Sequence, residues 1–275
     1  MGGHATLSPV RPERLRWLEP PALLRETFAD VRARLEEVAA RGPSEQVYTA
    51  HRRSVYRAEV PVLGSIAIKE LRNPSLARQL WFGWLAEHPG VREYRVGVAF
   101  EARGGRTLAN LGAALERSPF GLARVLLFTR WLDGAVTLTR WLAAQPGPPQ
   151  PRLHATLAAQ VAAAARLGLV HRRHSSNNLL VVVRHGEPVL YTIDFPNASL
   201  GPGLDLAGLA CDVARIARWI LREKIWSRAS VQAFFEAVAA EVRRETPPGE
   251  DLAARMAREL EAVIRDPSAH RELAA

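Results

Sequence analysis

Cysteine is almost absent from this chain of 275 residues, because Cys211 is the only one. A single cysteine cannot form an internal disulfide or a cysteine-based zinc site, and it suits a reducing compartment. Long hydrophobic runs are also missing: the longest, such as Val125–Phe128 and Leu179–Val183, are far shorter than a membrane span. The first residues contain no apolar stretch of the kind found in secretory signals. These absences favour a cytoplasmic protein.

Lysine is scarce, and arginine supplies nearly all of a formal net charge of +9 with a pI near 10.8. Such a charge fits nucleic acid, an anionic membrane surface or a phosphorylated substrate, and it is also what a GC-rich bacterial genome would encode. The sequence has no zinc finger, no aromatic RNA-binding motif and no basic region followed by heptads. We therefore expect no nucleic-acid partner.

The first half of the chain predicts one helix followed by short strands. Residues 21–41 have the spacing of an amphipathic helix, which Gly42-Pro43 ends. Further strands are expected after a helical stretch over 75–103 that breaks near His88-Pro89-Gly90. The predicted strands are Gln46–Thr49, Ser54–Val60, Ser65–Leu71, Leu111–Arg117 and Arg124–Trp131.

The second half is helical apart from one hairpin. The predicted helices are Thr137–Ala144, Leu153–Leu167, 204–224, 227–245 and 250–265, and a proline-rich linker lies between the first two. A single parallel α/β sheet would alternate strands and helices throughout, which this chain does not. The pattern predicts an α+β, bilobal fold with a β-rich N-terminal lobe and a helical C-terminal lobe.

The most informative stretch is His171–Phe195. It begins with the polar loop H-R-R-H-S-S-N-N, and a β-prone run, a turn near Arg184–Glu187 and a second run follow. Asn178 closes the loop and Asp194 closes the hairpin.

This layout resembles the catalytic loop H-R-D-x-x-x-x-N and the later D-F-G of protein-kinase-like phosphotransferases. His171 and Asn178 match the loop, and Asp194-Phe195 matches the metal-binding segment, although Pro196 replaces the glycine. Arg173 stands where the family has its catalytic aspartate. The resemblance implies a kinase-like fold with one catalytic hairpin, and domains at 1–44 (a helical extension), 45–132 (N-lobe) and 133–275 (C-lobe).

Lys69, at the end of the run S-I-A-I-K, matches the strand lysine of the family signature V-A-I-K. The resemblance implies that it pairs with nucleotide phosphates and needs a carboxylate partner on the following helix. Glu93, in R-E-Y, is the expected partner, and Glu101 is the alternative.

The loop that should cover the phosphates lies at His51-Arg52-Arg53-Ser54 and has no glycine. A glycine-rich loop lets backbone N–H groups approach phosphate closely, so its absence weakens the evidence for nucleotide binding. Arg52, Arg53 and Ser54 could contact phosphate through their side chains, or they could be ordinary turn residues.

The resemblance makes Asn178 and Asp194 the expected magnesium ligands. Mg²⁺ prefers hard oxygen donors and keeps several waters, so one amide and one carboxylate suffice when nucleotide phosphates complete the set. Two later carboxylates are expected to be structural: Asp212 bracing the catalytic loop, and Asp205 either capping a helix or placing a charge in its first turn.

Arg173 leaves the role of the catalytic base open. Arginine cannot accept a proton at neutral pH, although the adjacent His174 chemically could. The chain could bind nucleotide without turnover, use His174 as base, transfer slowly by positioning and metal alone, or bind an anionic substrate through Arg173.

Taken together, residues 45–225 resemble the lipopolysaccharide kinases, the Kdo and heptose kinases of the inner core. That family implies ATP, Mg²⁺ and a sugar hydroxyl on a membrane glycolipid, met at the cytoplasmic face of the inner membrane, where a basic chain suits an anionic surface. Two alternatives remain: a nucleotide-binding pseudokinase with a regulatory or scaffolding role, and a small-molecule kinase of the aminoglycoside or choline type. The latter usually carries H-G-D in its loop, which this chain lacks.

Overall fold

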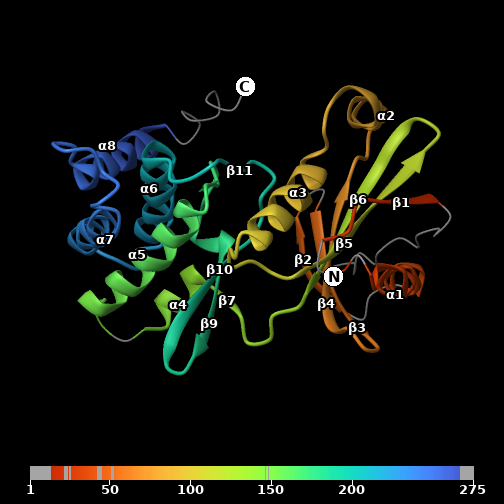
Figure 1. The fold of residues 1–275 in the computed structure, drawn as a ribbon, viewed down its shortest axis with the longest axis horizontal. Helices are drawn as coiled ribbons and strands as arrows, with labels where there is room; N and C mark the ends of the chain where they lie inside the picture. The colour runs from red at the N-terminus through yellow and green to blue at the C-terminus, as the bar shows by residue number, and fades with distance from the viewer. Residues whose placement is uncertain are drawn as a thin grey trace. The chain divides into compact units, whose positions relative to one another are not determined.

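The structure, a computed structural model, describes residues 14–21, 24, 26–41, 45–50, 53–145, 147 and 149–266 (Figure 1). The chain divides into two compact units, each with its own hydrophobic core. The first unit holds the residues up to Val98 together with Leu108–Asp133. The second holds Ala99–Thr107 and the residues from Gly134 onward. The fold is α+β, with a β-sheet N-terminal part and a helical C-terminal part.

The first unit is built on an antiparallel sheet of six strands in the order β1-β5-β6-β4-β3-β2. Its strands are β1 (Leu15–Trp17), β2 (Glu45–Ala50), β3 (Arg53–Val60), β4 (Gly64–Arg72), β5 (Asn110–Ser118) and β6 (Gly121–Arg130). Alternation along β4 sends Ile66 and Ile68 into the core that α1 (Phe28–Arg41) covers. Leu71 points to the other face and packs with α3 (Pro89–Ala102).

The second unit packs its helices around α6 (Leu206–Arg222), which buries nine residues. The other helices are α4 (Leu138–Ala143), α5 (Pro151–Arg166), α7 (Arg228–Glu241) and α8 (Leu252–Arg265). A hairpin of β9 (Leu179–Arg184) and β10 (Glu187–Thr192) pairs with the short β7 (Val136–Thr137). His185 and Gly186 form its turn, both with positive φ (52° and 80°), as a two-residue hairpin turn requires. The pair β8 (Leu169–Val170) and β11 (Ser199–Leu200) completes the strands.

The predicted helices and strands from Glu45 onward are confirmed to within a few residues. The first helix differs: it begins at Phe28, not near Pro21, after two turns in which Leu24 N donates to Pro21 O and Thr27 N to Leu24 O. Strand β1 was not predicted. It exists because it pairs with β5, a contact about 100 residues away in the sequence.

The helical stretch over 75–103 has the break that Pro89 predicts. α2 (Leu76–Leu80) runs into a single π-helical turn, η3 (Trp81–Leu85), and α3 begins at Pro89. His88 caps α3: its carbonyl accepts from Val91 N, and its ring Nδ1 accepts from Gly90 N at 3.0 Å. This cap sets the start of the helix that carries Glu93.

His88 makes stability depend on pH. Burial, with smaller effects from Arg78 and Arg53, lowers the pKa of His88 from 6.5 to about 4. Below pH 6.5 the unfolded chain therefore takes up a proton that the folded chain refuses until about pH 4. The free energy of unfolding should fall by about 2 kcal/mol between pH 6.5 and 5 from this residue alone.

The variant His88→Asn tests this, because asparagine keeps an acceptor at the helix cap but does not titrate. Urea unfolding at pH 7.5 and 5.0 should show a smaller loss of stability in the variant than in the wild type. Equal losses in the two proteins would exclude His88 as the source.

Candidate functional site

Lys69 lies on β4, which sits between β3 and β6 within the sheet. Because Ile68 and Glu70 point to the α1 face, the alternation turns Lys69 toward α3. Its Nζ lies 2.6 Å from Glu93 Oε1 and 2.9 Å from Oε2, and both side chains are largely buried. The expected pairing of Lys69 with Glu93, rather than with Glu101, is confirmed.

Glu70, the next residue on β4, was not recognised from the sequence. It is fully buried and accepts from Arg124 Nη1 at 2.6 Å, while Arg72 Nη2 lies 2.8 Å away. Arg124 also pairs with Glu116 across β5 and β6. A lone glutamate in an apolar run gives no signal of two distant arginines, so only the paired strands reveal this network.

Asp212 braces the polar loop, as expected. From α6, its carboxylate accepts from His171 N at 2.6 Å and from Arg172 N at 2.9 Å. Burial raises the pKa of Asp212 to about 7, while the two N–H donors and Arg215 pull it downward. Arg172 has φ +60°, a left-handed conformation that an arginine keeps only where the surroundings impose it.

The hairpin brings Asn178 next to the end of β10. Ile193 N donates to Asn178 O at 2.9 Å, and the His171 ring Nε2 donates to Ile193 O at 3.0 Å. Asn178 Nδ2 in turn donates to Arg173 O at 3.3 Å. The loop and the segment Ile193-Asp194 are thus held together through the main chain of Ile193, and Asp194 itself has φ +67°.

Arg173 and His174 have opposite surroundings. Arg173 is exposed, whereas His174 is buried and stacks on His171 with ring centroids 4.4 Å apart. Burial, with a smaller effect from His171, holds the pKa of His174 well below 6.5, so this ring is neutral at pH 7. Its Nε2 is a buried atom without a hydrogen-bond partner in the described structure.

The segment expected to be a phosphate-covering loop is shorter than predicted. Arg53 and Ser54 are the first residues of β3, because the pairing of β2 with β3 continues to Ala50 and Arg53. The prediction that these two residues lie in the loop is therefore wrong. Arg52 lies outside the described residues.

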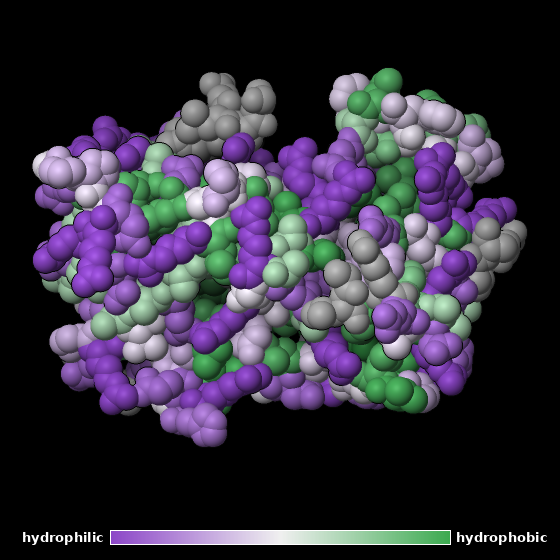
Figure 2. All heavy atoms as spheres, in the orientation of Figure 1, coloured by the Kyte–Doolittle hydropathy of each residue, from purple (hydrophilic) through white to green (hydrophobic). Residues whose placement is uncertain are grey.

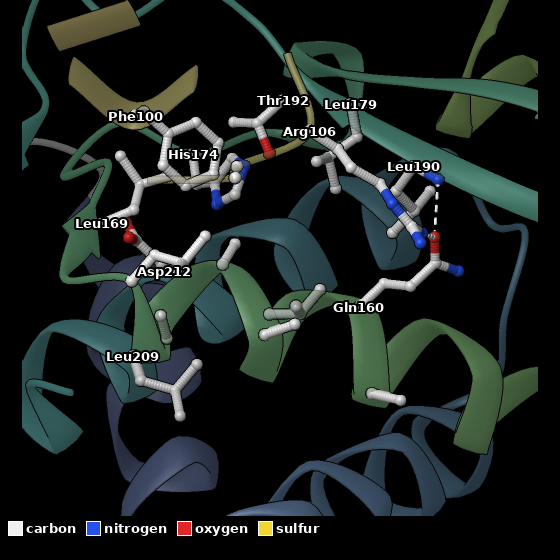
Figure 3. Close-up of a pocket in the computed structure, with 18 residues that line it drawn as sticks. Phe100, Arg106, Gln160, Leu169, His174, Leu179, Leu190, Thr192, Leu209 and Asp212 are labelled. Carbon is white, nitrogen blue, oxygen red and sulfur yellow. Dashed lines mark hydrogen bonds between the residues drawn. The ribbon is translucent and has the colours of Figure 1, made fainter. Parts of the chain in front are cut away.

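A cavity of about 360 Å³ lies inside the second unit, beneath the hairpin and between α5 and α6 (Figure 3). His174 and Asp212 line one end of it, and Arg106 and Gln160 line the other. Gln160 Oε1 accepts from both Arg106 Nη1 at 3.1 Å and Leu190 N at 2.8 Å. The remaining lining is mainly alanine and leucine.

Comparison with known proteins bears on the fold. Neither the family models nor the curated proteins searched give a match to this chain. Among solved structures, one described as WaaP in complex with acyl carrier protein matches with a TM-score of 0.54 at 21% identity, over 90% of this chain and 99% of that one. The chain has a protein-kinase-like fold. The PknI kinase domain of Mycobacterium tuberculosis aligns with a TM-score of 0.46 at 16% identity, over 79% of this chain and 95% of that one.

The kinase-like fold indicates which of the residues described above to test for phosphate and metal binding. In a kinase-like chain, the strand lysine with its helix glutamate and the loop with its hairpin aspartate are the parts that handle phosphate and metal. Lys69, Glu93, Asn178 and Asp194 match such positions in the sequence motifs. Their roles in binding stay predictions.

Removing the Asp212 carboxylate should loosen the loop. Asp212→Ala leaves two buried N–H groups unpaired, which costs about 1–3 kcal/mol for each. We expect a loss of about 2–6 kcal/mol in unfolding free energy and faster amide exchange at His171 and Arg172.

Asp205→Ala is the matched control, since Asp205 caps α6 by accepting from Ala207 N and Gly208 N. It should cost about 1 kcal/mol and leave exchange in the loop unchanged. Equal exchange in the loop of both variants would contradict a bracing role for Asp212.

Proposed function

We propose that this chain is an ATP-dependent phosphotransferase of the lipopolysaccharide-core sugar kinase type, acting on a sugar hydroxyl of a glycolipid. The observation that carries the proposal is the bidentate Lys69–Glu93 pair on the sheet of a kinase-like fold. A buried pair of this kind is costly unless it serves a purpose, because both charges lose water. Holding a lysine ready for nucleotide phosphates is such a purpose.

Asn178 and Asp194 are the residues that would hold Mg²⁺. They offer one amide oxygen and one carboxylate, and within the described residues no cluster of three or more histidine, cysteine, aspartate or glutamate side chains forms a metal site. A donor set this small, made of oxygen alone, fits Mg²⁺ that keeps waters and nucleotide phosphates as its other ligands. The bound ion would neutralise charge on the transferring phosphoryl group. Arg53 and Ser54 remain candidates for side-chain contacts to phosphate.

Arg173 should make turnover slow. The loop His171–Asn178 contains no carboxylate, so no acidic side chain of the loop can accept the proton of the acceptor hydroxyl. His174 is neutral but is buried and a weak base, because its pKa is depressed. The first alternative, a nucleotide-binding pseudokinase with a regulatory role, is favoured by the same exposed Arg173.

The acceptor and location follow from the same proposal. The solved WaaP chain aligns over 90% of this one. The resemblance to the core kinases implies a place of action at the cytoplasmic face of the inner membrane. Within the described residues no helix is both long and apolar enough to cross a bilayer. The proposal places the contact with the glycolipid at the membrane surface, because the net charge of +9 suits an anionic surface.

Nucleotide binding should raise the melting temperature. A ligand at 100 times its Kd stabilises the folded state by about 2.7 kcal/mol, which for a domain of this size is about 5 °C. ATP with Mg²⁺ should give such a shift, and the double variant Lys69→Met/Glu93→Gln should abolish most of it without leaving a buried carboxylate unpaired. Asp194→Asn, which keeps the positive φ, should also reduce the shift.

Lys224→Met is the matched control, because Lys224 is an exposed lysine of the second unit. It should keep the full shift. A shift that survives in both site variants would remove Lys69 and Asp194 from the nucleotide site.

Restoring the missing acid should raise activity. General-base help is worth about 10²–10⁴-fold in rate, so Arg173→Asp should increase phosphotransfer or ATP hydrolysis within that range. The control Arg184→Asp makes the same charge change on the exposed end of β9 and should leave the rate alone. A fast wild type that Arg173→Asp cripples would instead make Arg173 a clamp for an anionic substrate.

His174→Ala completes this test. A wild type that turns over and loses its activity in this variant, with a rate that falls as histidine is protonated, would identify His174 as the base.

A further inference from the structure

An exposed apolar surface lies at α2 and η3 of the first unit. These two short helices run without interruption from Leu76 to Leu85, and none of their ten residues is buried. Trp84 and Leu85 are each 72% exposed, and Trp81 is 53% exposed. A helix in a folded domain normally gains its stability by burying an apolar face. In this segment Phe82 packs on the core, but the other large apolar side chains are exposed.

The turn between β5 and β6 extends the same surface. Gly83 on η3 approaches it so closely that a Cβ there would lie 2.9 Å from Gly121 Cα. Ser118 and Gln79 join the two segments through a side-chain hydrogen bond of 2.6 Å. Phe120, at the tip of the turn, is 51% exposed. The tryptophan surface thus formed consists of Leu76, Leu80, Trp81, Trp84, Leu85 and Phe120.

Arginines lie among these apolar side chains. The Arg78 guanidinium lies 5.4 Å from the ring centroid of Phe82, and that of Arg117 lies 5.9 Å from Trp84. Both are exposed, and within the described part of the chain neither forms an ion pair. Residues 74–86 contain no aspartate or glutamate. The surface is therefore apolar and positively charged at once.

The space-filling view agrees with this description. Figure 2 shows hydrophobic side chains exposed where Figure 1 places α2, beside hydrophilic ones. An exposed patch with several large aromatic residues on a folded domain marks an interaction surface.

We propose that the tryptophan surface docks onto an anionic lipid bilayer. Tryptophan prefers the headgroup level of a membrane, leucine and phenylalanine gain by entering the acyl boundary, and arginine attracts anionic headgroups. The arginines lack acidic partners and so complement negative lipid rather than a neutral protein face. The inference deepens the proposed function, on which it rests for the identity of the bilayer, because it names the surface by which the chain would reach a glycolipid.

Vesicle sedimentation tests the proposal with the full chain. The wild type should bind vesicles of phosphatidylcholine with phosphatidylglycerol, and bind phosphatidylcholine alone more weakly. Trp81→Ser/Trp84→Ser should lower the partition coefficient at least about tenfold. Val62→Ser/Val183→Ser is the matched control, since both valines are exposed elsewhere, and it should bind as the wild type does.

A second pair of variants tests the contribution of the two arginines to vesicle binding. Arg78→Glu/Arg117→Glu should reduce binding to the anionic vesicles by about fivefold or more for each arginine lost, while binding to phosphatidylcholine changes little. Arg184→Glu/Arg244→Glu makes the same change in net charge at exposed positions of the second unit and should have a much smaller effect.

Three results would overturn the proposal: no binding to anionic vesicles at low salt, binding that the tryptophan variant retains, or a dimer of the wild type that this variant dissociates. The last would assign the surface to a second copy of the chain. The shift in melting temperature with ATP and Mg²⁺, measured on the same proteins, separates the two proposals. Vesicle binding without that shift would contradict the kinase alone, and the shift without vesicle binding would contradict the membrane surface alone.

Discussion

Buried carboxylates must find hydrogen-bond donors, and the placement of the candidate site residues follows from how three of them do so. Glu93 forms an ion pair with Lys69, and Asp212 accepts hydrogen bonds from two backbone N–H groups. Glu70 forms ion pairs with Arg124 and Arg72. Each is at most 7% exposed, so leaving any of them unpaired would cost several kcal/mol. Glu93 orients the lysine, Asp212 holds the loop in its conformation, and Glu70 connects central strands of the sheet.

The loop keeps the geometry of its fold while it changes the charge at one position. Asp212 imposes φ +60° on Arg172, and the contacts of His171 and Asn178 with Ile193 fix the loop against the hairpin. None of these bonds involves the side chain of Arg173, so nothing in the backbone prevents an arginine from replacing an acid there. The scaffold for catalysis and the group that would perform the proton transfer are separable, which is why binding and turnover need separate tests.

The tryptophan surface differs from the core in that its large apolar side chains are exposed to solvent. In the core of the first unit, Phe128 and Tyr56 are at most 1% exposed, whereas Trp81 and Trp84 of η3 are more than half exposed. The close approach of Gly83 to Gly121 brings the backbone of η3 against the sheet, and among the large side chains of η3 only Phe82 packs on the core. Because so much apolar side-chain area is exposed here, we expect a partner to cover it, and the proposed partner is the bilayer.

Local patterns in the sequence determined much of this protein. Alternation along β4 predicted which residues face each side, the turn residues predicted the hairpin, and Asp205 predicted a helix cap, since all of these depend on neighbours a few residues away. The resemblance of short motifs predicted the Lys69–Glu93 pair. The tertiary structure alone decided the strand at Leu15–Trp17, the helix start at Phe28, the placement of Arg53 in a strand, the burial of His174 and the partners of Glu70. Each of these features depends on contacts between segments far apart in the chain. A pattern of neighbouring residues cannot predict such contacts.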